Sequence, residues 1–373
     1  MARDPQQPYT YTSTGVDTDA AAVGLRKLLD WVSRTQEYRE GLGESLVPNG
    51  FFASVLRLSS RLALAVSTDG VGSKSVIAQM MGSYEAMGVD CVAVNVNDII
   101  CTGAEPIALL DYISLQVPHE DLLEQLGKGL QRGAERARIA IVGGELSQHP
   151  DTLIGPRPGY AFDIAGTGLG VLDDRAPITG KDILPGDVIL GLSSDGVHSN
   201  GLTLARPVLL GDDGKRVERF LESCGRTVGE ELLRPTHIYT REVAALLAAG
   251  VHIGGLAHIS GDGLLNLLRL DAAVGYRITS LPPVPPVFDV IQREGNISSA
   301  EMFRVFNMGI GFCVVVRAED VDNALAVLAE EQRADGGASA YAIGEVVAGP
   351  QRRVVLEEYH LVGEKGKFYQ QTG

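Results

Sequence analysis

The sequence predicts two consecutive α+β domains, each built on a mixed β-sheet. The chain has 373 residues, long enough for two hydrophobic cores, and its 45% hydrophobic and 21% charged residues are ordinary for a folded protein. Segments with strand and helix patterns alternate in both halves. Between the halves, residues 174–187 are polar and contain proline and glycine, which is typical of a linker.

The first domain is expected at residues 15–173, after an arm at 1–14 that we predict to be loose. Its expected elements are a packed helix carrying Lys27 (20–33), strands (52–58, 62–66), helices (74–81, 89–102), a strand (107–115), a helix (119–136) and strands (139–142, 164–172). This order indicates a layer of helices on one mixed sheet.

The second domain is expected at residues 188–362, followed by a polar tail at 363–373 that we predict to fray. Its expected strands lie at 188–192, 253–259, 312–317, 340–347 and 353–357, and its main helices at 236–249, 263–270 and 318–331.

Composition restricts the class of partner and the compartment. Acidic residues number 47 and basic residues 32, giving a net charge of −15, and no cluster of five Lys or Arg occurs, so nucleic acid and anionic membranes are disfavoured. No apolar run approaches the roughly 20 residues that cross a bilayer. Four widely spaced cysteines without a CxxC pair suit reduced core thiols. We therefore predict a cytoplasmic protein that binds a small molecule.

The segment Leu62–Lys74 is the first candidate for chemistry. Its apolar strand ends at Asp69, whose carboxylate suits a metal ion. Gly70 and Gly72 can adopt positive φ and present backbone N–H groups to an anion, and Lys74 offers a charge to a phosphate. The GxxxxGK[ST] spacing of a Walker A loop is absent, and an ordinary strand-to-helix turn remains the alternative.

The expected helix 89–102 carries polar residues within an apolar sequence. Asn95 and Asp98 are three residues apart and therefore share one face. Burying either group unpaired costs on the order of several kcal/mol, so each needs a partner. We predict a metal or phosphate site with Asp69, and a satisfied polar network in the core is the alternative.

Two further loops have the composition of binding loops. Gly143-Gly144-Glu145 follows an apolar strand, where a plain turn is the alternative. In the loop 193–201, His198 is a candidate donor to a phosphate oxygen, against the alternative of a surface histidine. Ser199 or Asn200 would cap the next helix and leave its first N–H groups facing a phosphate.

Taken in order, five loops resemble those of the phosphoribosylformylglycinamidine cyclo-ligase (AIR synthetase) family over about residues 15–357. The loops are Asp69-Gly-Val-Gly-Ser-Lys74, Val96-Asn-Asp98 with Gly103-Ala-Glu-Pro106, Gly143-Gly-Glu145, Gly196-Val-His-Ser-Asn-Gly201 and Phe306-Asn-Met-Gly309. The resemblance implies a ferredoxin-like first domain whose sheet joins that of a second subunit, then an α/β domain. It also implies a cleft for ATP and a divalent cation such as Mg²⁺, where formylglycinamidine ribonucleotide is closed to aminoimidazole ribonucleotide in purine biosynthesis.

The same resemblance implies roles for individual residues. The expected metal ligands are Asp69, Asp98 and Glu145. The expected catalytic residues are Asp69, Lys74, Glu145 and His198. The expected ATP-binding residues are Lys27, Gly70, Val71, Gly72, Ser73, Asn95, Asn97 and Asp111. The expected substrate-binding residues are Ser199, Asn200 and Gly201.

Some positions depart from the family pattern. Residues 146–150 read Leu-Ser-Gln-His-Pro, Asp195 stands where a serine is usual, and Asp262 interrupts a run of glycines. These changes surround the expected substrate side, so ATP binding is the firmer expectation. The alternatives are another ATP-dependent enzyme of the superfamily, such as thiamine-phosphate kinase, and a non-catalytic nucleotide-binding paralogue.

Overall fold

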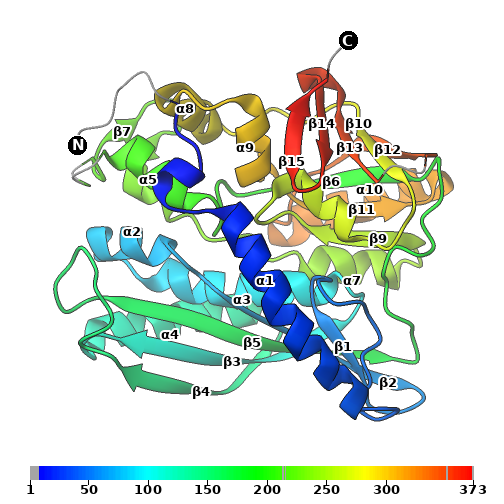
Figure 1. The fold of residues 1–373 in the computed structure, drawn as a ribbon, viewed down its shortest axis with the longest axis horizontal. Coiled ribbons are helices and arrows are strands. Elements are labelled where there is room, and N and C mark those ends of the chain that lie inside the picture. Colours follow the sequence, from blue (N-terminus) through cyan, green and yellow to red (C-terminus); the bar gives the residue numbers. More distant parts are fainter. Residues whose placement is uncertain (1–7, 212–213, 215, 350–351, 372–373) are drawn as a thin grey trace.

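A mixed sheet with helices on one face forms the first domain of the computed structural model, which describes residues 8–211, 214, 216–349 and 352–371 (Figure 1). In this part of the chain, the first sheet has five strands in the order β1-β2-β5-β3-β4. They are β1 (Ser54–Arg57), β2 (Leu62–Gly70), β5 (Phe162–Asp173), β3 (Glu105–Leu115) and β4 (Ala140–Gln148). Only β3 and β4 run parallel. The expected α+β class with a mixed sheet is thus confirmed.

Two helices, α3 (Glu85–Ile100) and α4 (Glu120–Ala137), pack on one face of this sheet, and α2 (Lys74–Met81) packs against α3. Helix α3 is buried on nearly every side because it lies between the sheet, α4 and the second domain. The opposite face of the sheet carries apolar side chains that are exposed or half-buried, among them Leu64, Val66, Leu110, Tyr112 and Leu169.

Strand β4 differs from its predicted form. It continues to Gln148 as an edge strand, so Gly143-Gly144-Glu145 lies inside a strand and not in a turn at its end. The register with β3 pairs Glu145 with Tyr112, which extends the ladder that the sequence placed at 139–142.

The second domain contains a larger mixed sheet. Among the described residues, eight strands follow the order β15-β14-β13-β10-β12-β6-β11-β9. They are β6 (Val188–Ser193), β9 (Ile253–His258), β10 (Gly275–Ile278), β11 (Ile310–Val316), β12 (Ala340–Val347), β13 (Val354–Leu356), β14 (Leu361–Glu364) and β15 (Lys367–Gln370). Its longer helices are α5 (Leu202–Leu210), α7 (Thr240–Ala248), α8 (Pro286–Gly295), α9 (Ser299–Val305) and α10 (Val321–Asp335). The hairpin β14–β15 contradicts the predicted frayed tail as far as residue 371.

The N-terminal segment also differs from expectation. Residues 1–7 of the predicted loose arm lie outside the described residues, but from Tyr9 onward the arm binds the second domain. The Tyr9 N–H donates to the Gly295 carbonyl (2.9 Å), and the Tyr11 N–H donates to the Glu301 carboxylate (2.8 Å).

Helix α1 (Thr18–Val32) follows the arm and passes in front of both domains in the view of Figure 1. The prediction of a packed helix is wrong, because its apolar side chains are largely exposed: Val23 (46%), Leu25 (54%), Leu28 (58%) and Trp31 (69%). In the described part of the chain, no helix is long and apolar enough to span a membrane.

Candidate functional site

A cleft of about 250 Å³ lies between the two domains. The first domain contributes Asp69 from the end of β2 and Asp98 from the last turn of α3. The arm contributes Tyr11. Loops and short helices of the second domain complete the wall with Asn200, Ser260, Gly261, Asp262, Arg269, Arg304 and Val305. Carboxylates and guanidinium groups thus face one another across this cleft.

Asp69 and Asp98 are brought together as predicted. Asn95 fixes the main chain of Asp69, because its Oδ1 accepts from the Asp69 N–H (3.0 Å) and its Nδ2 donates to the Asp69 carbonyl (3.2 Å). Nδ1 of His258 lies 2.8 Å from Oδ1 of Asp98 and orients that carboxylate. Burial and the charge of Asp98 raise the pKa of Asp69, although the Gly70 N–H opposes the shift. A cation between the two carboxylates would relieve this repulsion.

The remaining predicted ligands on α3 have different partners. Asn95 is occupied by Asp69 and by the Cys91 carbonyl (2.8 Å). Asn97 is fully buried, donating to the His237 carbonyl (2.8 Å) and accepting from the Tyr239 N–H (3.0 Å). Both amides thus take part in hydrogen bonds within the chain, as the alternative of a satisfied polar network expects, and their binding to ATP stays a prediction.

Lys74 is also not exposed to the cleft. Its side chain is 0% exposed, and its Nζ lies 2.5 Å from Asp90 Oδ2 and donates to the Arg234 carbonyl (2.5 Å). Burial lowers the pKa of Lys74, and the charge of Asp90 opposes this shift. The predicted phosphate contact is replaced by a buried ion pair that joins α2 and α3 to the second domain.

The glycine loop before α2 is only partly open. The Gly70 N–H donates to the Asp69 carboxylate (2.7 Å), and the N–H of buried Val71 donates to the Ile164 carbonyl (3.1 Å). The Ser73 hydroxyl pairs with that of Thr203 across the domain boundary (3.0 Å). Gly72 adopts the predicted positive φ of 66° and is exposed, so it is the position in this loop with open space around it.

The four predicted residues in the loop after β6, residues 198–201, have different surroundings from one another. Asn200 lines the cleft, whereas the Ser199 hydroxyl pairs with that of Thr236 (2.9 Å). Gly201 begins α5 with a φ of 79°, and a Cβ there would lie 2.4 Å from the Phe306 ring, so the position requires glycine. His198 is buried beside the cleft, contrary to the alternative of a surface histidine.

His198 has one free ring nitrogen. Its Nε2 accepts hydrogen bonds from the N–H groups of Asp195 (3.1 Å) and His237 (3.4 Å). The proton of the neutral ring is therefore on Nδ1, which is buried without a hydrogen-bond partner. Burial holds the pKa of His198 well below its usual value, despite the opposing charge of Asp195.

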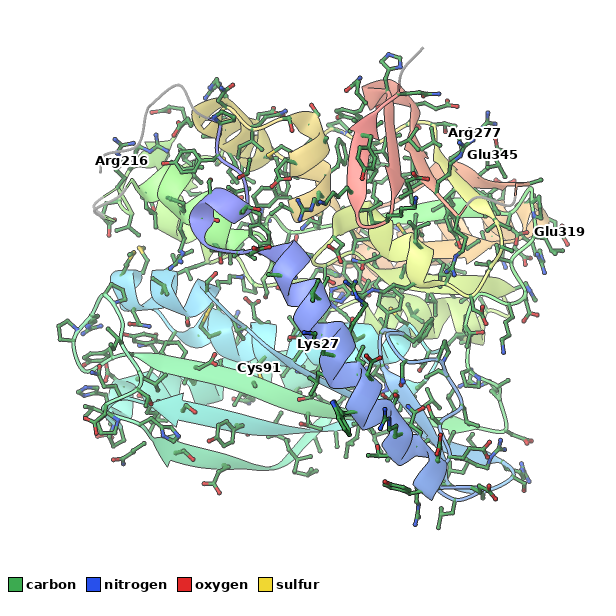
Figure 2. The ribbon with its side chains drawn as sticks, viewed as in Figure 1. Lys27, Cys91, Arg216, Arg277, Glu319 and Glu345 are labelled. Carbon is green, nitrogen blue, oxygen red and sulfur yellow. The ribbon has the colours of Figure 1, made fainter. Side chains whose placement is uncertain are left out.

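Three predicted residues lie apart from this pair of carboxylates. Asp111 faces the helix side of the sheet, with β5 between it and Asp69, and burial raises its pKa. Glu145 pairs with Tyr112, so its side chain lies on the opposite face. Glu145 therefore lies apart from Asp69 and Asp98 within this chain, and its role as a metal ligand stays a prediction. Lys27 is exposed on α1 (Figure 2).

Several cleft residues were missed by the sequence analysis. Arg269 and Arg304 lie at the ends of short helices, and Asp262 adopts a φ of 71° in a glycine turn. Asp262 stood out only as a departure from a family pattern. No local motif marked the two arginines, because the fold alone brings them to Asp69. Among the described residues, no group of three or more His, Cys, Asp or Glu could hold a metal, so a cation here needs oxygens from its ligand as well.

The fold and this cleft define a protein of the AIR synthase related class. The family model described as AIR synthase related protein, N-terminal domain, matches residues 52–172, and the model of the C-terminal domain matches residues 185–357. A thiamine monophosphate kinase from Aquifex aeolicus (TM-score 0.58, 17% identity, covering 89% of this chain and 96% of that one) and a hydrogenase maturation protein (0.57, 20%, 84% and 91%) share the fold.

Closer relatives identify the family within that class. The "Phosphoribosylformylglycinamidine cyclo-ligase" of Methanobrevibacter smithii is 44% identical over 319 residues, covering 86% of this chain and 91% of the relative. That of Methanothermobacter thermautotrophicus is 43% identical over 337 residues, covering 90% and 94%. The chain belongs to the phosphoribosylformylglycinamidine cyclo-ligase family, as the resemblance of its loops predicted.

Proposed function

We propose that this protein closes formylglycinamidine ribonucleotide to aminoimidazole ribonucleotide at the expense of ATP, releasing ADP and phosphate, in purine biosynthesis. The observation that carries the proposal is the pair Asp69 and Asp98, opposite two arginines in an interdomain cleft. The chain that holds this cleft is 44% identical to a cyclo-ligase over most of its length.

The reaction explains why the cleft needs charge of both signs. An amide oxygen is a poor leaving group, so ATP transfers its terminal phosphoryl group to the formyl amide oxygen. The amidine nitrogen then attacks the activated carbon, the C–O bond breaks, and phosphate leaves. The protein contributes placement and neutralisation of charge, as in other phosphoryl transfers.

We assign Asp69 and Asp98 to a divalent cation, with Mg²⁺ as the expected ion. Mg²⁺ in proteins is commonly held by one or two carboxylates together with phosphate oxygens, which fits a site with two carboxylates and a nucleotide. When bound, it would neutralise negative charge on the phosphates of ATP. Asn95 holds the main chain of Asp69, and His258 holds the carboxylate of Asp98.

On the opposite wall, Arg269 and Arg304 suit the phosphate of the ribonucleotide, because guanidinium groups bind phosphate in a fixed geometry. His198 holds its proton on Nδ1 beside Asn200, and we assign this N–H to donate to an oxygen of the bound substrate. Asn200 would contribute its amide to the same ligand.

We also propose a cytoplasmic homodimer. The uncovered face of the first sheet, with Leu64, Val66, Leu110, Tyr112 and Leu169, suits burial against a second copy. Substituting Leu110 by Glu is expected to give monomers in size-exclusion chromatography with light scattering, whereas an unchanged mass would exclude this face. The four cysteines are unpaired, and Cys91, Cys101 and Cys313 are buried, as a reducing compartment favours.

The decisive experiment measures phosphate release by the purified protein with ATP and Mg²⁺, with and without formylglycinamidine ribonucleotide, and the aminoimidazole colorimetrically. Matched amounts of phosphate and aminoimidazole are expected. Thiamine phosphate is the control substrate, and turnover with it alone would make the protein a kinase. ATP binding without turnover of either substrate would indicate a non-catalytic paralogue.

A further inference from the structure

The loop that carries His198 is tied to an imidazole placed between two carboxylates. Nδ1 of His237 lies 3.1 Å from Oδ2 of Asp195, and Nε2 of His237 lies 2.7 Å from Oε1 of Glu242. Both ring nitrogens therefore face acceptors, so the ring is fully paired only as an imidazolium that carries two protons. Although burial disfavours this charge, the two carboxylates raise the pKa of His237 to about 9.

His237 also acts through its main chain. Its N–H and that of Asp195 are the two donors to Nε2 of His198 (3.4 and 3.1 Å). The ion pair between the Asp195 and His237 side chains thus holds together the two backbone segments that donate hydrogen bonds to Nε2 of His198. Because both N–H groups donate to Nε2, this nitrogen must be the acceptor, and the neutral His198 ring carries its proton on Nδ1.

The segment containing His237 is fixed on the first domain. The Arg234 carbonyl accepts from Lys74 (2.5 Å), and the Thr236 N–H donates to Asp90 Oδ1 (2.6 Å). Asn97 bonds the His237 carbonyl and the Tyr239 N–H, as described above. Helix α3, which carries Asp98, therefore sets the position of His237.

We propose that Asp195, His237 and Glu242 form a positioning relay that holds His198 as its Nδ1–H tautomer beside the cleft. The relay rests on the proposed function of that cleft. Glu242 anchors the far end, because its Oε1 also accepts from the Ala338 N–H (3.0 Å). Asp195 is the end that can be substituted with little disturbance of the core, since its side chain is 52% exposed. The Asp195 carboxylate thus holds a charge on His237, which a neutral side chain at this position could not do.

Other charged groups lie around the relay and pair mainly with its two carboxylates. Arg234 lies 3.6 Å from Asp195, and Arg136 of α4 lies 3.4 Å from Glu242, so each carboxylate has a second cation. Lys74 adds positive charge near His198 from α2, and Tyr239 contacts the His237 ring (4.6 Å between centroids). Because the folded-state pKa of His237 lies above 6.5, the stabilisation is complete below that pH and is lost as pH rises through about 9.

The test substitutes Asp195→Ser, which removes the carboxylate at an exposed position and keeps a small polar side chain. Two-bond ¹⁵N–¹H spectra of the protein labelled with ¹⁵N-histidine report the tautomer and charge of each of its seven histidines without any substrate. In the unmodified protein, His198 is expected as the Nδ1–H tautomer and His237 as an imidazolium up to about pH 9. In the variant, His237 is expected to titrate at lower pH and His198 to show both tautomers.

Activity gives the second readout. For Asp195→Ser, kcat is expected to fall on the order of tenfold with little change in the KM for ATP, and the alkaline loss of activity to begin at lower pH. Asp174→Ser removes a carboxylate from a surface ion pair with Arg61 and serves as the matched control. An unchanged His198 tautomer together with an unchanged kcat would overturn the relay. If the unmodified protein fails to turn over the ribonucleotide, the proposed function fails, while the spectra still test the relay.

Discussion

The two walls of the cleft hold their side chains in different ways. On the first-domain wall, Asp69 and Asp98 belong to a strand end and a buried helix, and regular backbone hydrogen bonds set their positions. On the second-domain wall, Asp262 lies in a loop with a φ of 71°, and His198 beside that wall lies in a loop with a φ of 62°. Such conformations cost on the order of 1–3 kcal/mol in non-glycine residues and persist only where the surroundings enforce them. The backbone of the first wall is therefore regular secondary structure, whereas that of the second wall depends on loop conformations.

The largest effect is expected at the contact between the two domains, where the buried pair Lys74 and Asp90 meets the backbone of residues 234–239. Lys74→Met leaves the Asp90 carboxylate buried without its cation, and we expect a loss of about 3–5 kcal/mol in the free energy of unfolding. Chemical denaturation measures this loss. Replacing both partners, Lys74→Met with Asp90→Leu, is expected to regain most of it. Unchanged stability combined with a raised KM for ATP would restore the phosphate role that the sequence suggested for Lys74.

The next largest effect is expected on the first wall itself. Asp98→Asn removes one of two carboxylates proposed to hold the cation, and kcat is expected to fall by more than about a hundredfold, beyond the loss typical of supporting residues. Steady-state kinetics at saturating Mg²⁺ measure the effect, with Asp174→Asn as the control at the exposed surface. An Asp98→Asn enzyme with normal kcat would remove Asp98 from the metal site.

The smallest effect is a dependence on pH that separates the two walls. Burial raises the pKa of Asp69, so protons compete with the cation as pH falls, and the apparent affinity for Mg²⁺ should decrease towards acid pH. On the second-domain side, the ion pair between His237 and Asp195 is lost at alkaline pH, as His237 loses its proton near pH 9. Rate profiles at fixed and at saturating Mg²⁺ are expected to differ on the acid side only. Equal acid limbs would contradict this assignment of Asp69.

The same contrast explains what could be predicted from the sequence. Asp69 was found because an apolar strand ends there, and Asp98 because it lies one turn from Asn95 on an apolar helix. Lys74 and Asn97 also looked like binding residues in the sequence. Their partners lie at Arg234 and His237, far along the chain, so no local pattern reveals that these side chains are already hydrogen-bonded.

Two errors in the fold have a related origin. The apolar spacing of α1 correctly predicted a helix, but spacing does not say whether another element covers that face. In β4, the paired glycines suggested a turn, yet pairing with β3 keeps the strand extended through Gly144. Arg269 and Arg304 were missed because long-range packing of the second domain brings them to the cleft.

The buried polar contacts between the domains also determine how the protein should unfold on heating. Lys74, Asp90 and Asn97 bond the backbone between Arg234 and Tyr239, so neither domain can lose its fold without exposing the polar groups buried in the other. Two domains joined only by residues 174–187 would unfold in separate steps. Here, heat is expected to be absorbed in a single cooperative transition, with both sheets disappearing at one temperature.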